Sequence, residues 1–204
     1  MSEQTKRAHV PVAQRRTQLV EAAKAVMLRE GAWGLTTRAV AAEAGVPLGA
    51  VHYAFDSKGA LISAVFGADI ASVAAVVGEA LARGGSAEEI IVRAVRRYAE
   101  ELRRDPQAEL VVQELGLMGV RDPELAHLAA EAVTGYRAEI VAFLQGVAGV
   151  EGRSWEAPVE VIAEVFFGQL VGLAQNWLCT SDDDLLDACL DEVAVQLSHR
   201  LSPT

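Results

Sequence analysis

The sequence predicts an all-α protein of about nine helices, on three observations. Apolar residues recur every three or four positions through most of the chain, which is the period of a helix. Of the 204 residues, 51% are hydrophobic but only 5% are aromatic, and this composition suits closely packed helices with small side chains. No stretch alternates apolar and polar residues over a length that would form a strand, and the sequence has no internal repeat.

The first helix is expected over residues 15–30, where Leu19 and Val26 share an apolar face. The "GAWG" that follows supplies Gly31 and Gly34, which favour the turn conformations that end helices.

Two short helices come next, separated by a single glycine turn. Thr36 suits the N-cap of a helix over residues 37–44, because its hydroxyl can accept a bond from a free backbone N–H. Gly45 ends that helix, and Pro47 suits an early position of the third helix. Two short helices at a tight turn, packed on a preceding helix, predict a helix-turn-helix, whose second helix enters the DNA major groove.

The rest of the chain is expected to form six longer helices that begin or end near Ser, Pro, Gly and Asp residues. They cover residues 57–84, 86–104, 106–118, 122–147, 155–179 and 182–201. Two domains follow from this reading. The helix-turn-helix domain is expected over residues 1–57, and a helical domain for ligand binding and dimerisation over residues 58–204.

The charge is unevenly distributed along the chain. The net charge is −10, yet residues 1–60 contain eight Lys and Arg against five Asp and Glu, including Lys6 and Arg7. That segment is therefore +3 and the remainder −13. A basic head on an acidic body fits a protein that presents only its head to a polyanion.

Several functional classes lack support in the sequence. No apolar run approaches the length of a membrane span and no signal core opens the chain, so we expect a cytoplasmic protein. Cys179 and Cys189 predict neither a disulfide scaffold nor a metal site. We expect no cofactor, no metal and no catalysis, because the sequence has no nucleophile motif, phosphate loop or paired carboxylates, and its four histidines are scattered.

Residues 34–65, "GLTTRAVAAEAGVPLGAVHYAFDSKGALISAV", resemble the N-terminal DNA-binding domain of the TetR family of transcriptional regulators. The resemblance rests on a Thr-x-x-x-Val-Ala opening, an Ala-Gly-Val turn and an aromatic-x-Phe-x-x-Lys close. It extends back through the first helix, which makes about a third of the chain; the remainder is similar only in architecture. Two departures are Pro47, where the family often has Ser, and His52, where it often has Tyr.

This resemblance implies that the recognition helix runs from about Leu48 to Phe55 and assigns the residues at DNA. Base edges would be read by Leu48, Gly49, Ala50 and Tyr53, with Arg38 entering from the preceding helix. Phosphates would be bound by Thr37, His52 and Lys58, beside the capping Thr36. The alternatives are a solvated charge for Arg38, a local hydrogen bond for His52 and a core position for Tyr53; Phe55 is expected in the core.

The last two helices are expected to form a homodimer interface, because one helix-turn-helix covers too little DNA for tight binding. Their apolar stripes give the expected interface residues: Phe166, Leu170, Leu173, Trp177, Leu186, Leu190, Val193 and Leu197. Gly168 and Gly172 would permit close helix approach. The alternative is the core of a monomer. Asp182, Asp183 and Asp184 are expected to cap the last helix, not to bind metal.

The middle helices are expected to enclose a ligand pocket. Its candidate residues are Tyr98, Gln113, Met118, His127, Tyr136, Phe167, Gln169 and Asn176. An aliphatic lining would suit a largely apolar small molecule, and Arg97, Arg121 or His127 would select an anionic group.

Together these patterns predict a transcriptional regulator that binds a specific DNA sequence. We expect it to be a dimeric repressor that a small molecule releases from a palindromic operator. The alternatives are a DNA-binding or DNA-organising protein without an effector, and an all-α enzyme.

Overall fold

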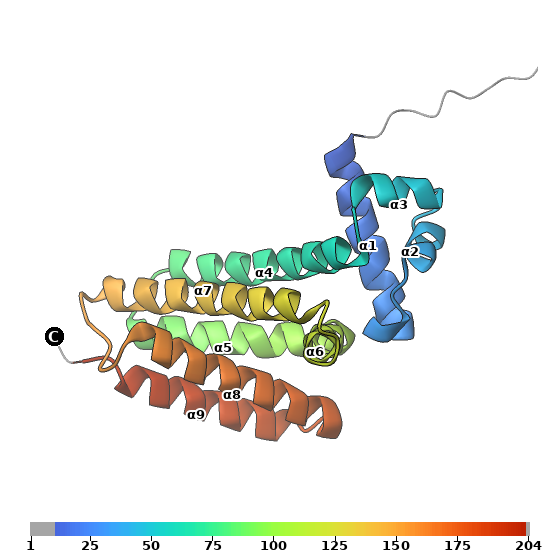
Figure 1. Ribbon diagram of the computed structural model, residues 1–204. Helices are drawn as coiled ribbons and strands as arrows, with labels where there is room; N and C mark the ends of the chain where they lie inside the picture. Colours follow the sequence, from blue (N-terminus) through green and yellow to red (C-terminus); the bar gives the residue numbers. More distant parts are fainter. Residues whose placement is uncertain (1–10, 203–204) are drawn as a thin grey trace, which may run out of the picture. The chain divides into compact units, whose positions relative to one another are not determined.

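The computed structural model describes residues 11–202, and within them the chain is all-α, as expected (Figure 1). Residues 1–10, with Lys6, Arg7 and His9, and residues 203–204 lie outside this part. Nine α-helices and one short 3-10 helix, Ala32–Gly34, are present among the described residues. The α-helices are α1 Val12–Glu30, α2 Thr37–Glu43, α3 Leu48–Ala54, α4 Lys58–Ala82, α5 Ala87–Arg104, α6 Pro106–Arg121, α7 Ala126–Val150, α8 Val159–Thr180 and α9 Asp183–His199.

The chain divides into two compact units, the first ending at Val65 and the second beginning at Phe66. The expected boundary at residue 57 follows the loop before α4. The division by packing lies two turns later, because Leu61 and Ile62 in the first turns of α4 are fully buried and belong to the first unit.

Local hydrogen bonds explain where the helices of the first unit begin. The Thr36 hydroxyl accepts a bond from the Ala39 N–H at 3.1 Å, and the Ser57 hydroxyl accepts one from the Ala60 N–H at 3.0 Å, so both predicted caps are confirmed. Gly45 makes the turn after α2 with φ of +63°. Pro47 lies just before α3 and not inside it.

The core of the first unit forms where α2 and α3 pack on α1. Leu19 and Val26 of α1 are fully buried, and Val51 of α3 and Phe55 are buried with them. The Arg16 guanidinium lies 4.2 Å from the centroid of the Phe55 ring and donates to the Ala54 carbonyl, so it fixes the end of α3 against α1.

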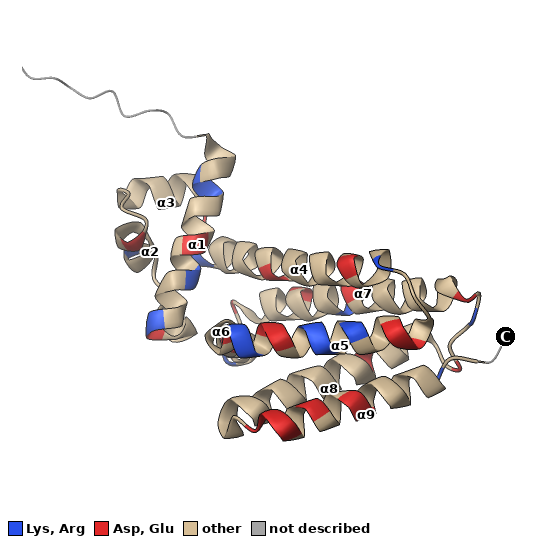
Figure 2. Cartoon of the chain, turned by 180° about the vertical axis from the view of Figure 1, so that it is seen from behind, with Lys and Arg blue, Asp and Glu red and all other residues tan. Residues whose placement is uncertain are grey.

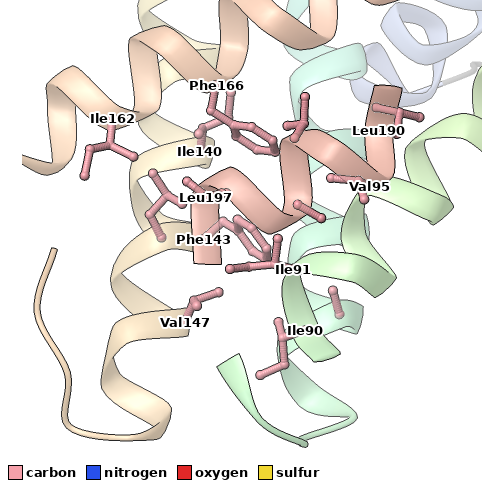
Figure 3. Packing of buried hydrophobic residues seen from close by; sticks show 14 of the residues in the cluster. Ile90, Ile91, Val95, Ile140, Phe143, Val147, Ile162, Phe166, Leu190 and Leu197 are labelled. Carbon is pink, nitrogen blue, oxygen red and sulfur yellow. The ribbon is translucent and has the colours of Figure 1, made fainter. Parts of the chain in front are cut away.

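The second unit has one large apolar core, to which α5, α7, α8 and α9 contribute most (Figure 3). α5 begins with a capping box, in which the Ser86 hydroxyl and the Glu89 carboxylate each accept a backbone N–H. The labelled side chains of the cluster include Ile91, Val95, Phe143, Leu190 and Leu197.

Charged residues occur along α5 and α9 (Figure 2), and these two helices pack against each other. Arg103 of α5 donates to Asp183 at 2.9 Å and to Asp187 at 2.6 Å. Asp182 accepts the Leu185 N–H at 3.0 Å and caps α9. The acidic start of α9 is thus used for capping and ion pairing.

Glycines set the distance between several helices of the second unit. A Cβ at Gly135 of α7 would lie 2.6 Å from Ile70 of α4, and one at Gly146 would lie 2.7 Å from Leu81. The sequence predicted that this helix ends at residue 147, but α7 continues to Val150. Gly146 is needed there because it allows α4 and α7 to approach closely.

A single substitution tests this close packing. A Cβ at Gly119 of α6 would overlap the Ala129 Cβ of α7 and come within 3.3 Å of the Leu125 carbonyl oxygen, and backbone cannot move aside cheaply. We therefore expect Gly119→Val to lower the free energy of unfolding by about 1–3 kcal/mol, as overpacking does. Denaturant titration measures this. Gly116→Val on the same helix, where a Cβ meets nothing within 4 Å, is the control; equal stability of the two variants would contradict the close approach.

Contrary to the expectation from sequence, two helices are long and apolar enough to cross a membrane by length and composition. These are α4, with a window of mean hydropathy 2.1, and α8, with 1.2. This is weak evidence for a span, because long helices of soluble proteins pass the same test. α4 also places Asp69 in the middle of its apolar stretch, where the carboxylate accepts the Tyr136 hydroxyl of α7 at 2.6 Å.

Candidate functional site

The helix-turn-helix presents one side of α3 to solvent. Val51 and Ala54 face the core, whereas Gly49, His52 and Tyr53 are exposed. Tyr53 is 75% exposed, so the core alternative for this ring is excluded, while Phe55 is 2% exposed and lies in the core as expected. Leu48 and Ala50 are half-buried.

The side chains expected at DNA differ from the other basic residues of the first unit in one respect. Arg29 pairs with Glu43 at 2.9 Å, Lys24 pairs with Glu21, and Arg16 binds the end of α3. By contrast, Arg38 at the start of α2 makes no ion pair or hydrogen bond with any residue in the range 11–202.

The same holds for His52 and Lys58 within the described chain. His52 therefore lacks the local hydrogen bond that was its alternative, and Lys58 begins α4 beside the Ser57 cap. Arg38 and Lys58 are unpaired cations at helix starts, next to free backbone N–H groups, and this arrangement suits phosphate binding, whereas His52 lies in the last turn of α3. Thr36 caps α2, and Thr37 in its first turn is half-buried.

The predicted dimer residues require a correction, because most of them are buried within the chain. Leu186, Leu190, Val193 and Leu197 of α9 are 2–6% exposed, and Phe166 of α8 is 5% exposed. The α9 stripe faces the core with α5, so it has no free surface for a second copy. Leu170, Leu173 and Trp177 are half-buried against the same core.

The side of α8 that faces away from the core is exposed to solvent and carries small and apolar residues at helical spacing. Val161 is 53% exposed and Val165 49%, and Gly168, Gly172 and Cys179 continue the stripe. A Cβ at either glycine would meet nothing within 4 Å. The α8 stripe therefore offers an exposed surface for close helix approach, which the buried α9 stripe does not.

Several of the residues expected to line a ligand pocket meet in the second unit. Tyr136 of α7 and Phe167 of α8 stack with ring centroids 5.8 Å apart. The Tyr98 hydroxyl of α5 donates to the Leu170 carbonyl at 3.3 Å, and Gln113 donates to Glu109 within α6 at 3.0 Å.

Two carboxylates that the sequence analysis did not select, Asp69 and Glu109, accept hydrogen bonds from members of this group, Tyr136 and Gln113 respectively. Burial raises the pKa of the Glu109 carboxyl. The hydrogen bond from Gln113 lowers this pKa, and the nearby charge of Asp69 raises it. Burial also raises the pKa of Tyr98 and Tyr136, and both carboxylates act on each hydroxyl in the same direction. We call Asp69, Tyr98, Glu109, Gln113, Tyr136 and Phe167 the carboxylate–tyrosine cluster.

The other expected ligand residues lie elsewhere. Met118 is buried and Gln169 half-buried, whereas His127 and Asn176 are exposed. The cations expected to select an anionic ligand are also outside the cluster: Arg97 pairs with Glu100 and Glu101 within α5, and Arg121 is exposed. The group is therefore more acidic and more aromatic than the aliphatic lining that the composition suggested.

A signal for Asp69 was present in the sequence. It is the one charged residue in the stretch from 59 to 78 of α4, and an acid inside an apolar helix needs a partner. Glu109 had no such signal, because it stands among polar residues at the start of α6. Within residues 11–202, no three His, Cys, Asp or Glu side chains gather where they could hold a metal ion.

The chain is similar to known bacterial regulatory proteins. Residues 19–65 match the family model described as bacterial regulatory proteins, tetR family. The HTH-type nicotine-responsive transcriptional repressor HdnoR of Paenarthrobacter nicotinovorans is 23% identical over 194 residues, covering 91% of this chain and 99% of the relative.

Solved structures share the fold over nearly the whole chain. A TetR-family transcriptional regulator from Rhodococcus sp. superposes with a TM-score of 0.78 at 20% identity, covering 93% of this chain and 100% of that one. The regulator FadR of Bacillus subtilis, solved in complex with stearoyl-CoA, gives a TM-score of 0.71 at 20% identity, covering 89% and 96%. At these identities the likeness shows the fold alone.

Proposed function

We propose a mode of action from one premise, that this chain is a DNA-binding transcriptional regulator whose N-terminal domain belongs to the TetR family. It acts as a homodimeric repressor that binds a palindromic operator and leaves it when a small molecule enters the helical domain. Members of this family are regulators and not enzymes, and we propose neither catalysis nor a cofactor for this chain. Its DNA target places it in the cytoplasm.

The observation that carries the DNA-binding proposal is the set of unpaired side chains on the helix-turn-helix. Arg38, His52 and Lys58 have no partner among the described residues, and Tyr53 is 75% exposed. No hydrogen bond or ion pair within the described chain accounts for these side chains, so they remain available to bind DNA. Arg is the usual bidentate reader of guanine, and a Tyr ring can contact the thymine methyl group. Arg38 and Tyr53 are therefore proposed at bases, and His52 and Lys58 at phosphates.

The proposal of a dimer rests on the α8 stripe. An exposed row of Val and Gly residues on a helix fits an isologous contact with the same helix of a second copy, because glycines let two backbones approach. Two heads held in this way would read two half-sites about one DNA turn apart.

Two relatives support control by a small molecule. The HdnoR repressor is described as nicotine-responsive, and FadR was solved with stearoyl-CoA. These ligands are chemically unlike, so they support an effector without naming it. A ligand that prefers one arrangement of the helical domain would bias the dimer toward or away from the DNA-bound state.

Selection of binding sites from random duplex DNA tests the proposed function. We expect an enriched palindrome, bound with an affinity that falls steeply as salt rises, because each phosphate contact releases counterions. A folded, dimeric sample that enriches no sequence at low salt would contradict the proposal. Enrichment of a single half-site without symmetry would remove only the dimeric part.

A further inference from the structure

The carboxylate–tyrosine cluster gathers negative charge in the helical unit, and no cation among residues 11–202 pairs with it. Asp69 and Glu109 are both half-buried, and each accepts a hydrogen bond from a neutral donor, Tyr136 and Gln113 respectively. Neither carboxylate forms an ion pair with any Lys, Arg or His in the part of the chain described. Buried carboxylates are ordinarily paired, so this arrangement costs stability in the unliganded protein.

The two carboxylates come from different helices and converge on the same aromatic group. Asp69 is on α4 and Glu109 on α6, yet both raise the pKa of Tyr98 on α5 and of Tyr136 on α7. Tyr136 in turn stacks on Phe167 of α8. Carboxylates beside aromatic faces attract organic cations through charge and through the ring quadrupole.

One position on the Glu109 face of α6 has no close neighbours. Glu109, Gln113 and Gly116 follow one face of α6 at helical spacing. Gly116 is half-buried, yet a Cβ there would meet nothing within 4 Å.

We propose that the effector of this protein is an organic cation, a protonated amine on an apolar or aromatic skeleton, bound by Asp69 and Glu109. This rests on the proposed function, in which a small molecule controls DNA binding, and adds the chemical class of that molecule. The amine replaces the missing positive charge, and its skeleton lies against Tyr136 and Phe167. Because the ligand contacts helices α4 to α8 at one point, its binding changes how these helices pack.

The test uses matched probes that differ in charge. Phenethylamine and tryptamine are compared with the alcohols of the same skeletons, 2-phenylethanol and tryptophol, and with phenylacetate and indole-3-acetate. The readouts are the thermal unfolding midpoint of the full chain and its release from the selected operator. We expect the amines to raise the midpoint and weaken operator binding, and the alcohols and carboxylates to do neither.

Isosteric variants locate the effect. Asp69→Asn and Glu109→Gln keep the hydrogen bonds to Tyr136 and Gln113 but remove the charge, so each should weaken amine binding by about 10- to 100-fold, the value of a charge-assisted bond. Glu131→Gln, an exposed position of α7, is the matched control and should bind as the wild type does. Glu109→Gln should also raise the unfolding midpoint of the unliganded protein at neutral pH.

Three results would overturn the inference. In the first, the alcohols bind as well as the amines. In the second, both variants bind the amines with affinities within twofold of wild type. In the third, a sample that binds its operator responds to no amine. The last result leaves the DNA-binding function standing and removes only the cationic effector. Failure to bind any DNA sequence would instead contradict the proposed function.

Discussion

Replacing Arg38 with Ala is expected to lower operator affinity by about 100-fold. One bidentate interaction with a base contributes about 1–3 kcal/mol, and a dimer makes this interaction in both half-sites. The side chain is exposed and has no partner among the described residues, so its removal leaves no buried group unsatisfied. Titration of fluorescent operator DNA at fixed salt measures the decrease.

Arg29→Ala is the matched control for this prediction. Arg29 is also an exposed arginine of the first unit, but it pairs with Glu30 and Glu43 and is not among the expected DNA contacts. Its removal should change operator affinity by less than about threefold, because exposed ion pairs contribute little. If Arg38→Ala bound as tightly as the wild type while remaining folded, α2 could not be assigned to the DNA face.

A comparison of Arg38 with Lys58 separates specificity from simple charge. Removal of Arg38 should relax the preference for the base that it reads, whereas removal of the phosphate ligand Lys58 should weaken binding equally to all sequences. Lys58→Ala should in addition reduce the slope of log affinity against log salt by about one for each phosphate that is no longer neutralised. Titrating both variants on operators with single base changes tests this.

The fold was largely predictable because helix ends in this chain have strong local signals. Thr36 and Ser57 supply cap hydroxyls, Gly45 supplies a positive φ, and α5 begins at a capping box. The differences from the prediction are at helix ends, by a few residues. α7 was expected to end at residue 147 and continues to Val150, and α6 was expected to end at residue 118 and continues to Arg121.

The site was predictable only where a sequence pattern extends over many fixed positions. The short helices around Gly45 carry such a pattern, and the exposure of Tyr53 and the burial of Phe55 both agree with it. The interface residues predicted on α9 are buried in the chain's own core, because two apolar helices offer several stripes and periodicity does not say which stripe faces that core. On α9 the Leu190 stripe turned inward toward α5.

The residues of the proposed effector site depend on which helices meet, and the sequence does not contain that information in a local form. Tyr98, Gln113, Tyr136 and Phe167 were selected for their type, and the structure brings them together. Asp69 and Glu109 were not selected, since carboxylates are ordinary surface residues until another helix covers them. The chemistry of the proposed effector therefore follows from the packing of α4, α6 and α7 and not from composition.

The second large effect is expected at the α8 stripe, where Gly168→Leu should raise the dimer dissociation constant by about 100-fold. Leu at this position meets open space within the chain, and in a helix it is favoured over Gly by about 0.8–1 kcal/mol. The isolated chain should thus fold at least as well as the wild type. An isologous contact, however, receives the added side chain from both copies, and overpacking costs about 1–3 kcal/mol for each. Sedimentation over a concentration series measures the dissociation constant.

Gly78→Leu on α4 is the control, since Gly78 is also exposed and a Cβ there meets nothing within 4 Å. It should remain dimeric and bind its operator normally. Gly168→Leu should bind the palindrome weakly yet keep its affinity for an isolated half-site, because the helix-turn-helix is unchanged. This separates a defect in dimerisation from a defect in the DNA surface. If Gly168→Leu stayed as dimeric as the control, the two copies would have to meet through a surface other than the Val161–Gly172 face of α8.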